Sequence, residues 1–433
     1  MGSAARLRRW TWRQTRPSGG GIVIRRILIA CLVVAAIQLA ARLPAHQPMP
    51  PTQPTTDPDL AASMTVLVRP PYPPLHKGHV DISTGLYFRE DDDLVINTPF
   101  PIVLRRTYNS GDGHSRQFGI NTTHLGEWWL YGDGDPRVPW ADLILEDGRQ
   151  IHFTRISPGN GQQDAVLRHD STPSEFNGAL LSWNGSTWEM QFPDGGLAVF
   201  LDCPSKRDVC SLVERRDPQG HRIAYVRDAW GKLLWMESEG QSIAFDYDST
   251  GRIVRAYDTS RREVAYTYDD QGRLVRATGS DGIVRMYEYD DRNNLVGVRE
   301  PGRILRNWYD DAGREVRQVV RRSEYDDDPY VATVKYVVEG GSVVETDFEE
   351  GDGLMVYRYN AQGYIVSETL DADGPAPIVF TYDVDPISNV SHGATMSCLG
   401  PSGRVTRAVH VSPRDGDSEA KDELIHESCL SRR

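Results

Sequence analysis

The chain has 433 residues, of which 25% are charged, and its formal net charge at pH 7 is −13. Residues 1–45 contain eight arginines and no other charged residue, and subtracting these eight from the 48 basic residues leaves 40 against 61 acidic ones, a net charge of −21. This acidity argues against a nucleic-acid partner, because nucleic acids favour a basic face.

Residues 27–41 form a run of fifteen uncharged residues directly after Arg25 and Arg26. A basic segment followed by an apolar run of this length is typical of a signal peptide, whereas a complete membrane span needs about 20 residues. Because Leu43-Pro44-Ala45 is a poor cleavage site, residues 1–45 are either a signal peptide or an uncleaved N-terminal membrane anchor. We expect an exported protein of the periplasm or cell surface, or a secreted one, tethered to the inner membrane if residues 27–41 are retained.

Residues 46–75 are rich in proline, with pairs at Pro50-Pro51, Pro70-Pro71 and Pro73-Pro74. Proline-rich segments of this kind are extended and form no packed core, so we predict a linker. A polyproline ligand for a partner protein is a less favoured alternative.

Residues 76–200 have the alternating pattern of a β domain. Ala141 to Phe153 reads as a strand, an Asp-Gly turn and a strand, and Trp188 to Phe200 repeats that layout. We expect these hairpins to lead into the following sheet without a break. Five tryptophans could form a sugar-binding platform, although aromatic residues of this kind more often pack in a core: Trp128, Trp129, Trp140, Trp183 and Trp188.

Residues 201–385 contain a short phrase of Tyr-Asp, two variable residues, Gly and Arg. It begins at Tyr247, Tyr268, Tyr289 and Tyr309, which are 21, 21 and 20 residues apart, and weaker copies flank it. A period of this length indicates one supersecondary unit copied many times, here two strands and two turns. The Asp is expected to cap a turn by accepting backbone N–H groups, and the Gly to supply a positive φ. Asn293 replaces Gly in one copy, and asparagine tolerates that conformation better than most residues.

These phrases resemble the Rhs/YD-repeat family of bacterial surface and secreted proteins, over roughly Asp217 to Asp383. The order of Val80-Asp81 with Thr84-Gly85, then Thr107-Tyr108-Asn109-Ser110, then Phe118-Gly119 and Trp128, is similar to the domain of unknown function that commonly precedes Rhs repeats. The resemblance implies a coiled β-sheet shell. Many family members close this shell with a core segment and release a toxin domain, but residues 386–433 lack that segment's motif and are short for a toxin.

Four cysteines lie outside the apolar run, and this even number is typical of disulfides in an exported protein. Nearest-neighbour pairing gives Cys203–Cys210 and Cys398–Cys429, although other pairings remain open. We found no sequence motif for catalysis, for a cofactor or for a metal, and predict no such site. The acidic runs Asp91–Asp93 and Asp326–Asp328 are expected to lie in solvated loops.

The sequence therefore predicts an all-β protein in which an N-terminal β domain continues into a repeat sheet, followed by a tail at residues 386–433 that holds a last partial repeat. At this length we expect an open, curved strip with an exposed concave face rather than a closed shell. The predicted function is a non-catalytic scaffold or binding protein of the bacterial envelope, with carbohydrate or another envelope protein as the partner. The alternative is a truncated or split component of a toxin-delivery shell in contact-dependent competition.

Overall fold

The computed structural model describes residues 75–76, 80–132, 135–202, 210–229, 231–351, 353–375, 377–385, 391–399 and 402–411. These residues lie in one compact unit. Two short 3₁₀ turns, η1 (Leu125–Glu127) and η2 (Gln162–Asp164), are the helical elements of this part of the chain, and nearly all the rest of its regular structure is strand. The predicted all-β class is confirmed. The predicted signal or anchor segment, the linker before Leu75 and residues 412–433 lie outside the described residues.

A separate five-stranded antiparallel sheet, termed the N-terminal sheet, opens the described chain. A two-stranded ribbon accompanies it. The strands of the sheet are β1 (Leu75–His76), β2 (Val80–Asp81), β3 (Leu86–Ile96), β4 (Ile102–Asn109) and β7 (Thr122–His124), and those of the ribbon are β5 (Ser115–Arg116) and β6 (Gly119–Ile120).

The next strands form a ring, because β15 pairs with β14 on one side and with β8 on the other. Its two predicted hairpins are present, β9 with β10 and β13 with β14. The ring strands are β8 (Trp129–Tyr131), β9 (Trp140–Ile144), β10 (Gln150–Arg155), β11 (Val166–Arg168), β12 (Leu180–Trp183), β13 (Thr187–Gln191), β14 (Leu197–Leu201) and β15 (Cys210–Arg216).

From β15 the same sheet continues as a ladder in which each strand pairs antiparallel with the next. β31 and β32 lie within the predicted tail. The ladder strands are β16 (Arg222–Arg227), β17 (Leu233–Ser238), β18 (Gln241–Tyr247), β19 (Ile253–Asp258), β20 (Glu263–Tyr268), β21 (Leu274–Gly279), β22 (Val284–Tyr289), β23 (Leu295–Glu300), β24 (Arg303–Tyr309), β25 (Glu315–Arg321), β26 (Tyr330–Glu339), β27 (Ser342–Glu350), β28 (Gly353–Tyr359), β29 (Ile365–Leu370), β30 (Ile378–Val384), β31 (Ser391–Leu399) and β32 (Val405–Val411).

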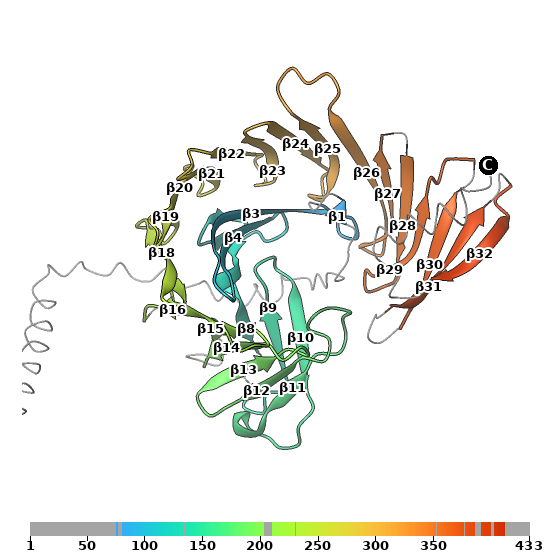
Figure 1. The fold of residues 1–433 in the computed structure, drawn as a ribbon. Helices are drawn as coiled ribbons and strands as arrows, with labels where there is room; N and C mark the ends of the chain where they lie inside the picture. Colours follow the sequence, from blue (N-terminus) through green and yellow to red (C-terminus); the bar gives the residue numbers. More distant parts are fainter. Residues whose placement is uncertain are drawn as a thin grey trace, which may run out of the picture. The chain divides into compact units, whose positions relative to one another are not determined.

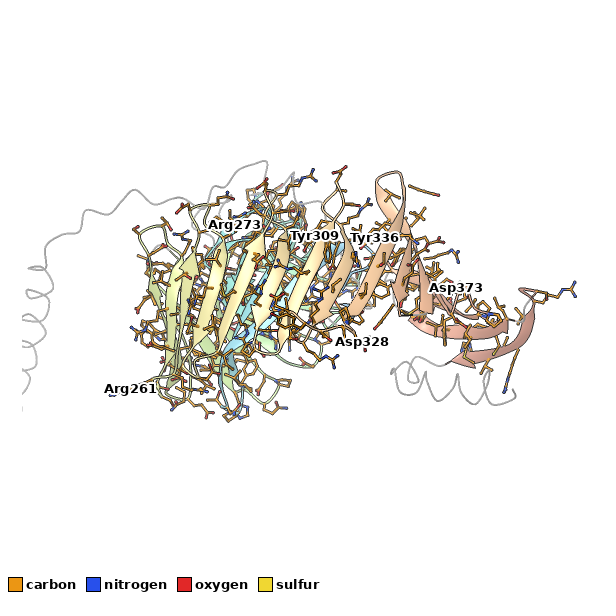
Figure 2. The ribbon with its side chains drawn as sticks, turned by 90° about the horizontal axis from the view of Figure 1, so that it is seen from above. Arg261, Arg273, Tyr309, Asp328, Tyr336 and Asp373 are labelled. Atoms are coloured by element: carbon orange, nitrogen blue, oxygen red, sulfur yellow. The ribbon has the colours of Figure 1, made fainter. Side chains whose placement is uncertain are left out.

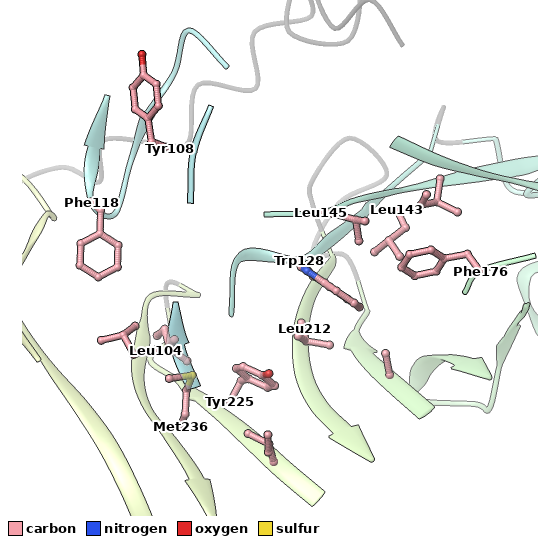
Figure 3. Close-up of a cluster of buried hydrophobic side chains, with 14 of the residues drawn as sticks. Leu104, Tyr108, Phe118, Trp128, Leu143, Leu145, Phe176, Leu212, Tyr225 and Met236 are labelled. Atoms are coloured by element: carbon pink, nitrogen blue, oxygen red, sulfur yellow. The ribbon is translucent and has the colours of Figure 1, made fainter. Parts of the chain in front are cut away.

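The ladder curves around the N-terminal sheet, so that β3 and β4 face the inner side of β18–β25 (Figure 1). One apolar core joins the two sheets and the ring: Tyr87 and Leu104 come from the N-terminal sheet, Phe153 from the ring, and Ile243 and Leu305 from the ladder. Figure 3 shows part of this core around Trp128 and Leu212. Burying each such side chain stabilises the fold by about 1.5–3 kcal/mol. A smaller, separate cluster around Phe380 and Met396 lies between β30 and β31.

The ladder is an open, curved strip, as predicted: its first strand, β16, joins the β8–β15 ring, and β32 pairs only with β31 among the described strands. The expectation of an exposed concave face is corrected, because β3 and β4 cover the inner face of β18–β25 (Figure 1). The physical reason is that one curved sheet leaves an apolar inner face, and the N-terminal sheet buries it. Only the ring half of the predicted N-terminal domain continues into the repeat sheet, since β1–β4 and β7 form their own sheet.

Candidate functional site

The Tyr-Asp turns have the geometry that their sequence predicts. In the copy at Asp248, one carboxylate oxygen accepts hydrogen bonds from the backbone N–H groups of Thr250 and Arg252, both at 2.9 Å. Gly251 has a φ of 87°, and Asn293 in the equivalent position has a φ of 66°. The second carboxylate oxygen of Asp248 accepts from Arg252 Nε at 2.8 Å. The aspartates are thus turn caps, as predicted.

The tyrosine of each phrase ties its repeat to the one before it, a role that the sequence analysis did not identify. Its hydroxyl donates to a backbone carbonyl 14 or 15 residues earlier: Tyr247 to Leu233 O, Tyr268 to Ile253 O, Tyr289 to Leu274 O and Tyr309 to Leu295 O, at 2.5, 2.5, 2.8 and 2.9 Å. In two of these copies the ring also lies against the arginine of the preceding turn: the guanidinium of Arg252 lies 4.6 Å from the centre of the Tyr268 ring, and that of Arg273 lies 5.3 Å from the centre of the Tyr289 ring. Tyr and Arg therefore form a clamp between consecutive repeats.

Tyr336 is a clamp that the sequence does not reveal, because no Tyr-Asp phrase surrounds it. Its hydroxyl donates to Glu315 O at 2.6 Å, and Arg314 lies 5.2 Å from the centre of its ring. The longer connection between β25 and β26 hides it from the 21-residue period. Figure 2 shows Arg273, Tyr309 and Tyr336 along one edge of the sheet and Arg261 and Asp328 along the other.

A buried charged network joins the N-terminal sheet to the ladder, and it is the most densely charged part of the described interior. Arg106 of β4 binds Asp93 of β3 at 2.5 Å, and these side chains are 3% and 0% exposed. Arg89 binds Asp91 at 2.7 Å, with 4% and 7% exposure. Arg89 also reaches Glu300 of β23 at 3.0 Å.

Two ladder tyrosines complete this network from the opposite side. Tyr266 of β20 donates to Asp93 at 2.6 Å, and Tyr287 of β22 donates to Asp91 at 2.9 Å. Tyr287 in turn accepts a hydrogen bond from Arg106 at 3.0 Å. These contacts cross between segments about 170–200 residues apart in the chain, so the network fixes how the two sheets dock.

The electrostatics of the network favour the ionised carboxylates. Burial alone would raise the pKa of Asp91, but the positive charges of Arg106 and Arg89 outweigh it and lower the pKa to about 2. Burial raises the pKa of Tyr287, so its hydroxyl stays protonated and remains a donor. The arrangement offers ion pairs and hydrogen bonds but no activated nucleophile, which makes it suited to holding the sheets together.

This network overturns the expectation that Asp91–Asp93 lies in a solvated loop. The run belongs to β3, where a bulge between Asp92 and Leu94 interrupts the pairing with β4. Because side chains alternate along a strand, Asp91 and Asp93 both reach Arg106 on the inner side, while Asp92 pairs with Arg105 on the exposed side at 2.5 Å. The sequence does not show this alternation of buried and exposed side chains, because all three residues are aspartates.

Glu315 and Glu127 are two further glutamates with a buried carboxyl oxygen, and the sequence did not single out either of them. Glu315 occupies the position where other repeats carry Ile253 or Leu274, and it is 1% exposed. Burial raises its pKa well above 4.5, only partly opposed by a hydrogen bond from Gln318. Burial likewise raises the pKa of Glu127 to about 7, despite the opposing charge of Arg116. Glu315 accepts a hydrogen bond from Gln318, and Glu127 accepts one from the backbone N–H of Gln117.

The five tryptophans of the proposed sugar platform do not share one surface. Trp128 and Trp188 are buried, at 5% and 6% exposure, and Trp128 Nε1 donates to Glu146. Trp183 packs edge-on against Trp188, with ring centres 5.5 Å apart. Trp129 and Trp140 are half-buried. At least two of the five therefore serve the core.

Two of the four cysteines are described. Cys210 lies in β15 and Cys398 in β31, and both are buried. Cys203 and Cys429 lie outside the described residues, so the disulfide pairing stays a prediction. Within the described ranges, no three metal-ligating side chains come together as a metal site would require, and no helix is long and apolar enough to cross a membrane.

Comparisons with known proteins agree with this architecture. A family model described as Teneurin YD-shell matches residues 232–386, and one described as Domain of unknown function (DUF6531) matches residues 77–153. Both matches support the predicted resemblance to the Rhs/YD-repeat family. The Tyr-Asp clamps and turns from Tyr247 onward lie within the residues that match the YD-shell model, and the β3–β4 hairpin that covers the inner face lies within the matched preceding domain.

Comparison with the curated proteins finds no match. Among solved structures, the chain is similar to a crystal structure of TcdB2-TccC3-TEV, with 11% identity and a TM-score of 0.31 over 76% of this chain and 22% of that one. A mutant Tc holotoxin pore of Photorhabdus luminescens gives 13% identity and a TM-score of 0.26 over 75% and 24% of the two chains. A porin-like protein from Bacteroides uniformis gives 10% identity and a TM-score of 0.17, over 54% of this chain and 91% of that one. This chain thus spans less than a quarter of the length of the two toxin chains.

Proposed function

We propose that this YD-repeat shell protein is an exported, non-catalytic scaffold of the bacterial envelope whose outer surface binds carbohydrate or another envelope protein. The observation that carries the proposal is the docking of β3 and β4 against the inner face of the ladder, through the buried Arg106–Asp93 and Arg89–Asp91 pairs. The turn aspartates are occupied as caps, so they are not available as ligands. Contact with a partner is then left to the outer face.

The same observation weighs against the toxin-delivery alternative. A shell that encloses a cargo needs free interior surface, and here the inner face beside β3 and β4 is occupied by the protein's own N-terminal sheet. Residues 386–433 include β31 and β32, which extend the ladder. The N-terminal segment would provide the only contact with the membrane, and a nucleic-acid partner is disfavoured by the net charge of −13.

Two experiments test the proposal. Binding of the purified protein to an array of bacterial envelope glycans should give reproducible signals for a subset of sugars, and a silent array would leave only a protein partner. Expression of residues 386–433 in the bacterial cytoplasm should leave growth unchanged. Growth arrest would favour the toxin alternative, and a small immunity-like protein encoded next to this chain would favour it further.

A further inference from the structure

A groove of about 520 Å³ lies across β24, β25 and β26, next to the turn that follows Tyr309. Its outward-facing row is formed by Trp308, Arg317 and Thr333, which are direct neighbours across the three strands. Directly opposed residues of antiparallel strands point to the same side of a sheet. Since Leu305 and Asn307 of the same strand are buried, this row lies on the outer face.

Trp308 is an unusual residue for this face because it is a large aromatic side chain left 44% exposed. The guanidinium of Arg317 lies 5.1 Å from the centre of its ring. This cation–π contact holds the arginine beside the groove. A flat ring with a positive charge at its side is a preformed platform, in which little side-chain freedom remains to be lost on binding.

The positive charge of Arg317 is not neutralised, as a comparison with a similar pair shows. Arg255 also lies over an aromatic ring, 4.6 Å from the centre of Tyr257, but it binds Asp246 at 3.4 Å and Glu263 at 2.9 Å. Arg317 has no carboxylate partner among the residues that the structure describes. The Thr333 hydroxyl also makes no hydrogen bond within the described parts of the chain, so it can serve a ligand.

Lys335 adds a second positive charge, two residues along β26 from Thr333 and on the same side. Its ammonium binds Glu349 at 2.6 Å, with both side chains strongly exposed. Exposed pairs of this kind contribute about 0–1 kcal/mol, so an anionic ligand can compete for the lysine. The groove thus has a cationic centre in a chain whose net charge is −13.

Acidic side chains of the neighbouring strand β27 border the cationic centre of the groove on one side. Asp347 lies opposite Lys335, and Glu349 lies opposite Thr333. Burial raises the pKa of Asp347, and repulsion from Glu345 and Glu349 adds to it. A long polyanion such as nucleic acid would meet this acidic wall, whereas a ligand with one or two negative groups would not.

We propose that this groove binds an acidic saccharide, with a sugar ring on Trp308, its carboxylate on Arg317 and Lys335, and a hydroxyl on Thr333. A planar arginine suits a carboxylate because it offers parallel N–H donors. The volume is within the range of roughly 300–1,000 Å³ of small-molecule sites and suits one or two sugar rings. The proposal rests on the proposed binding function and names the class of its ligand.

The test is isothermal titration calorimetry of the purified full-length protein with a galacturonic-acid trisaccharide, and with the neutral galactose trisaccharide as the comparison. The acidic sugar should bind at least tenfold more tightly than the neutral one. Trp308→Ala and Arg317→Gln should each weaken binding about tenfold or more, since either removes one of two principal contacts. Arg255→Gln, at the neutralised cation–π pair, should leave binding unchanged.

Absent binding, equal binding of the two sugars, or equal losses in Arg317→Gln and Arg255→Gln would each overturn the groove proposal. Equally strong binding of a triglutamate peptide would assign the groove to acidic peptides instead and would also overturn it. The circular-dichroism melting temperature of each variant shows whether a loss of binding reflects unfolding. Signals on the glycan array that survive both groove substitutions would refute this site while leaving the proposed function intact.

Discussion

The glycine position of the YD-repeat turn is determined by its backbone conformation and not by side-chain contacts. Gly251 has a φ of 87°, and a Cβ added there would meet no atom within 4 Å. The preference for glycine is therefore a matter of the backbone alone. Asn293 shows the tolerance of the site, since it occupies the same turn position at a φ of 66°.

Gly251→Ala is expected to lower the free energy of unfolding by about 1–2 kcal/mol, the usual cost of a left-handed conformation for a residue with a Cβ. Gly251→Asn should cost less than half as much, because asparagine adopts this conformation more readily. Urea unfolding followed by circular dichroism measures both. Equal losses in the two variants would contradict the backbone explanation.

The buried glutamates give the stability of this protein a defined dependence on pH. The pKa of Glu315 is raised well above its unfolded value of 4.5, so the unfolded chain loses the proton first as pH increases. The contribution of Glu315 is fully present below about 4.5 and is lost as pH rises toward the folded pKa. The pKa of Glu127 is raised to about 7, so its contribution to stability is likewise lost as pH rises from about 4.5 to about 7.

Glu315→Gln should therefore become more stable relative to the native chain as pH rises above about 5, by on the order of 1 kcal/mol per pH unit until the folded pKa is reached. Glu127→Gln should show the same gain up to about pH 7 and no further gain above it. Free energies of unfolding, measured in urea across this pH range, report both differences. A difference that does not change with pH would show that the glutamate is ionised in the folded protein.

At the scale of elements, the clamp of Tyr and Arg explains why the repeat period is so regular. The tyrosine of each phrase reaches a carbonyl of the preceding repeat, and the rings of Tyr268 and Tyr289 also contact the preceding arginine. These contacts fix the distance between turns. The phrase predicted the turns and strands from alternation and from Asp and Gly. It could not predict Tyr336, because that contact depends on which strand lies next. The inward position of Glu315 was available from the repeat, since Glu315 stands where other copies carry Ile253 and Leu274.

Tyr268→Phe is expected to lower the free energy of unfolding by about 1 kcal/mol, because it removes the hydrogen bond to Ile253 O and keeps the ring under Arg252. Tyr257→Phe is the matched control, since Tyr257 also lies under an arginine and before a turn aspartate, Asp258, but its hydroxyl makes no hydrogen bond within the part of the chain that the structure describes. Tyr257→Phe should lower the free energy of unfolding by less than about 0.5 kcal/mol, the usual range for such surface changes. Equal losses in chemical denaturation would mean that the clamp hydrogen bond adds nothing.

At the scale of the whole molecule, docking of the N-terminal sheet against the ladder depends on buried ion pairs, which water does not screen. Adjacent residues of β4 provide a direct comparison. Arg106 and Asp93 are buried, at 3% and 0% exposure, whereas Arg105 and Asp92 are 36% and 40% exposed. Removing one partner of a buried pair leaves the other charge uncompensated, while an exposed pair can be replaced by water.

Arg106→Met should thus lower the free energy of unfolding by about 3–5 kcal/mol, and Arg105→Met by less than about 1 kcal/mol. Adding Asp93→Asn to Arg106→Met should recover part of the loss, because it removes the stranded charge. Guanidinium denaturation of the three variants provides these values. Similar losses for Arg105→Met and Arg106→Met would refute the role of the network in docking.

The cysteine prediction also belongs to the whole molecule, because it concerns links between distant strands and export. Thiol counting on the denatured protein purified from the periplasm should find no free thiol among Cys203, Cys210, Cys398 and Cys429. Peptide mapping by mass spectrometry should then identify the pairs, with Cys203–Cys210 and Cys398–Cys429 expected. Four reactive thiols would exclude the disulfides.

The sequence alone determined the repeat, its turns, the all-β class and the resemblance to the Rhs/YD-repeat family, because these follow from local backbone preferences recurring every 20 or 21 residues. It did not determine where the two sheets meet. Asp91–Asp93 appeared to be a solvated acidic run, and only the packing of β3 against β20 and β22 turned two of its carboxylates into a buried docking network. The physical reason is that burial depends on neighbours nearly 200 residues away, and no local pattern carries that information.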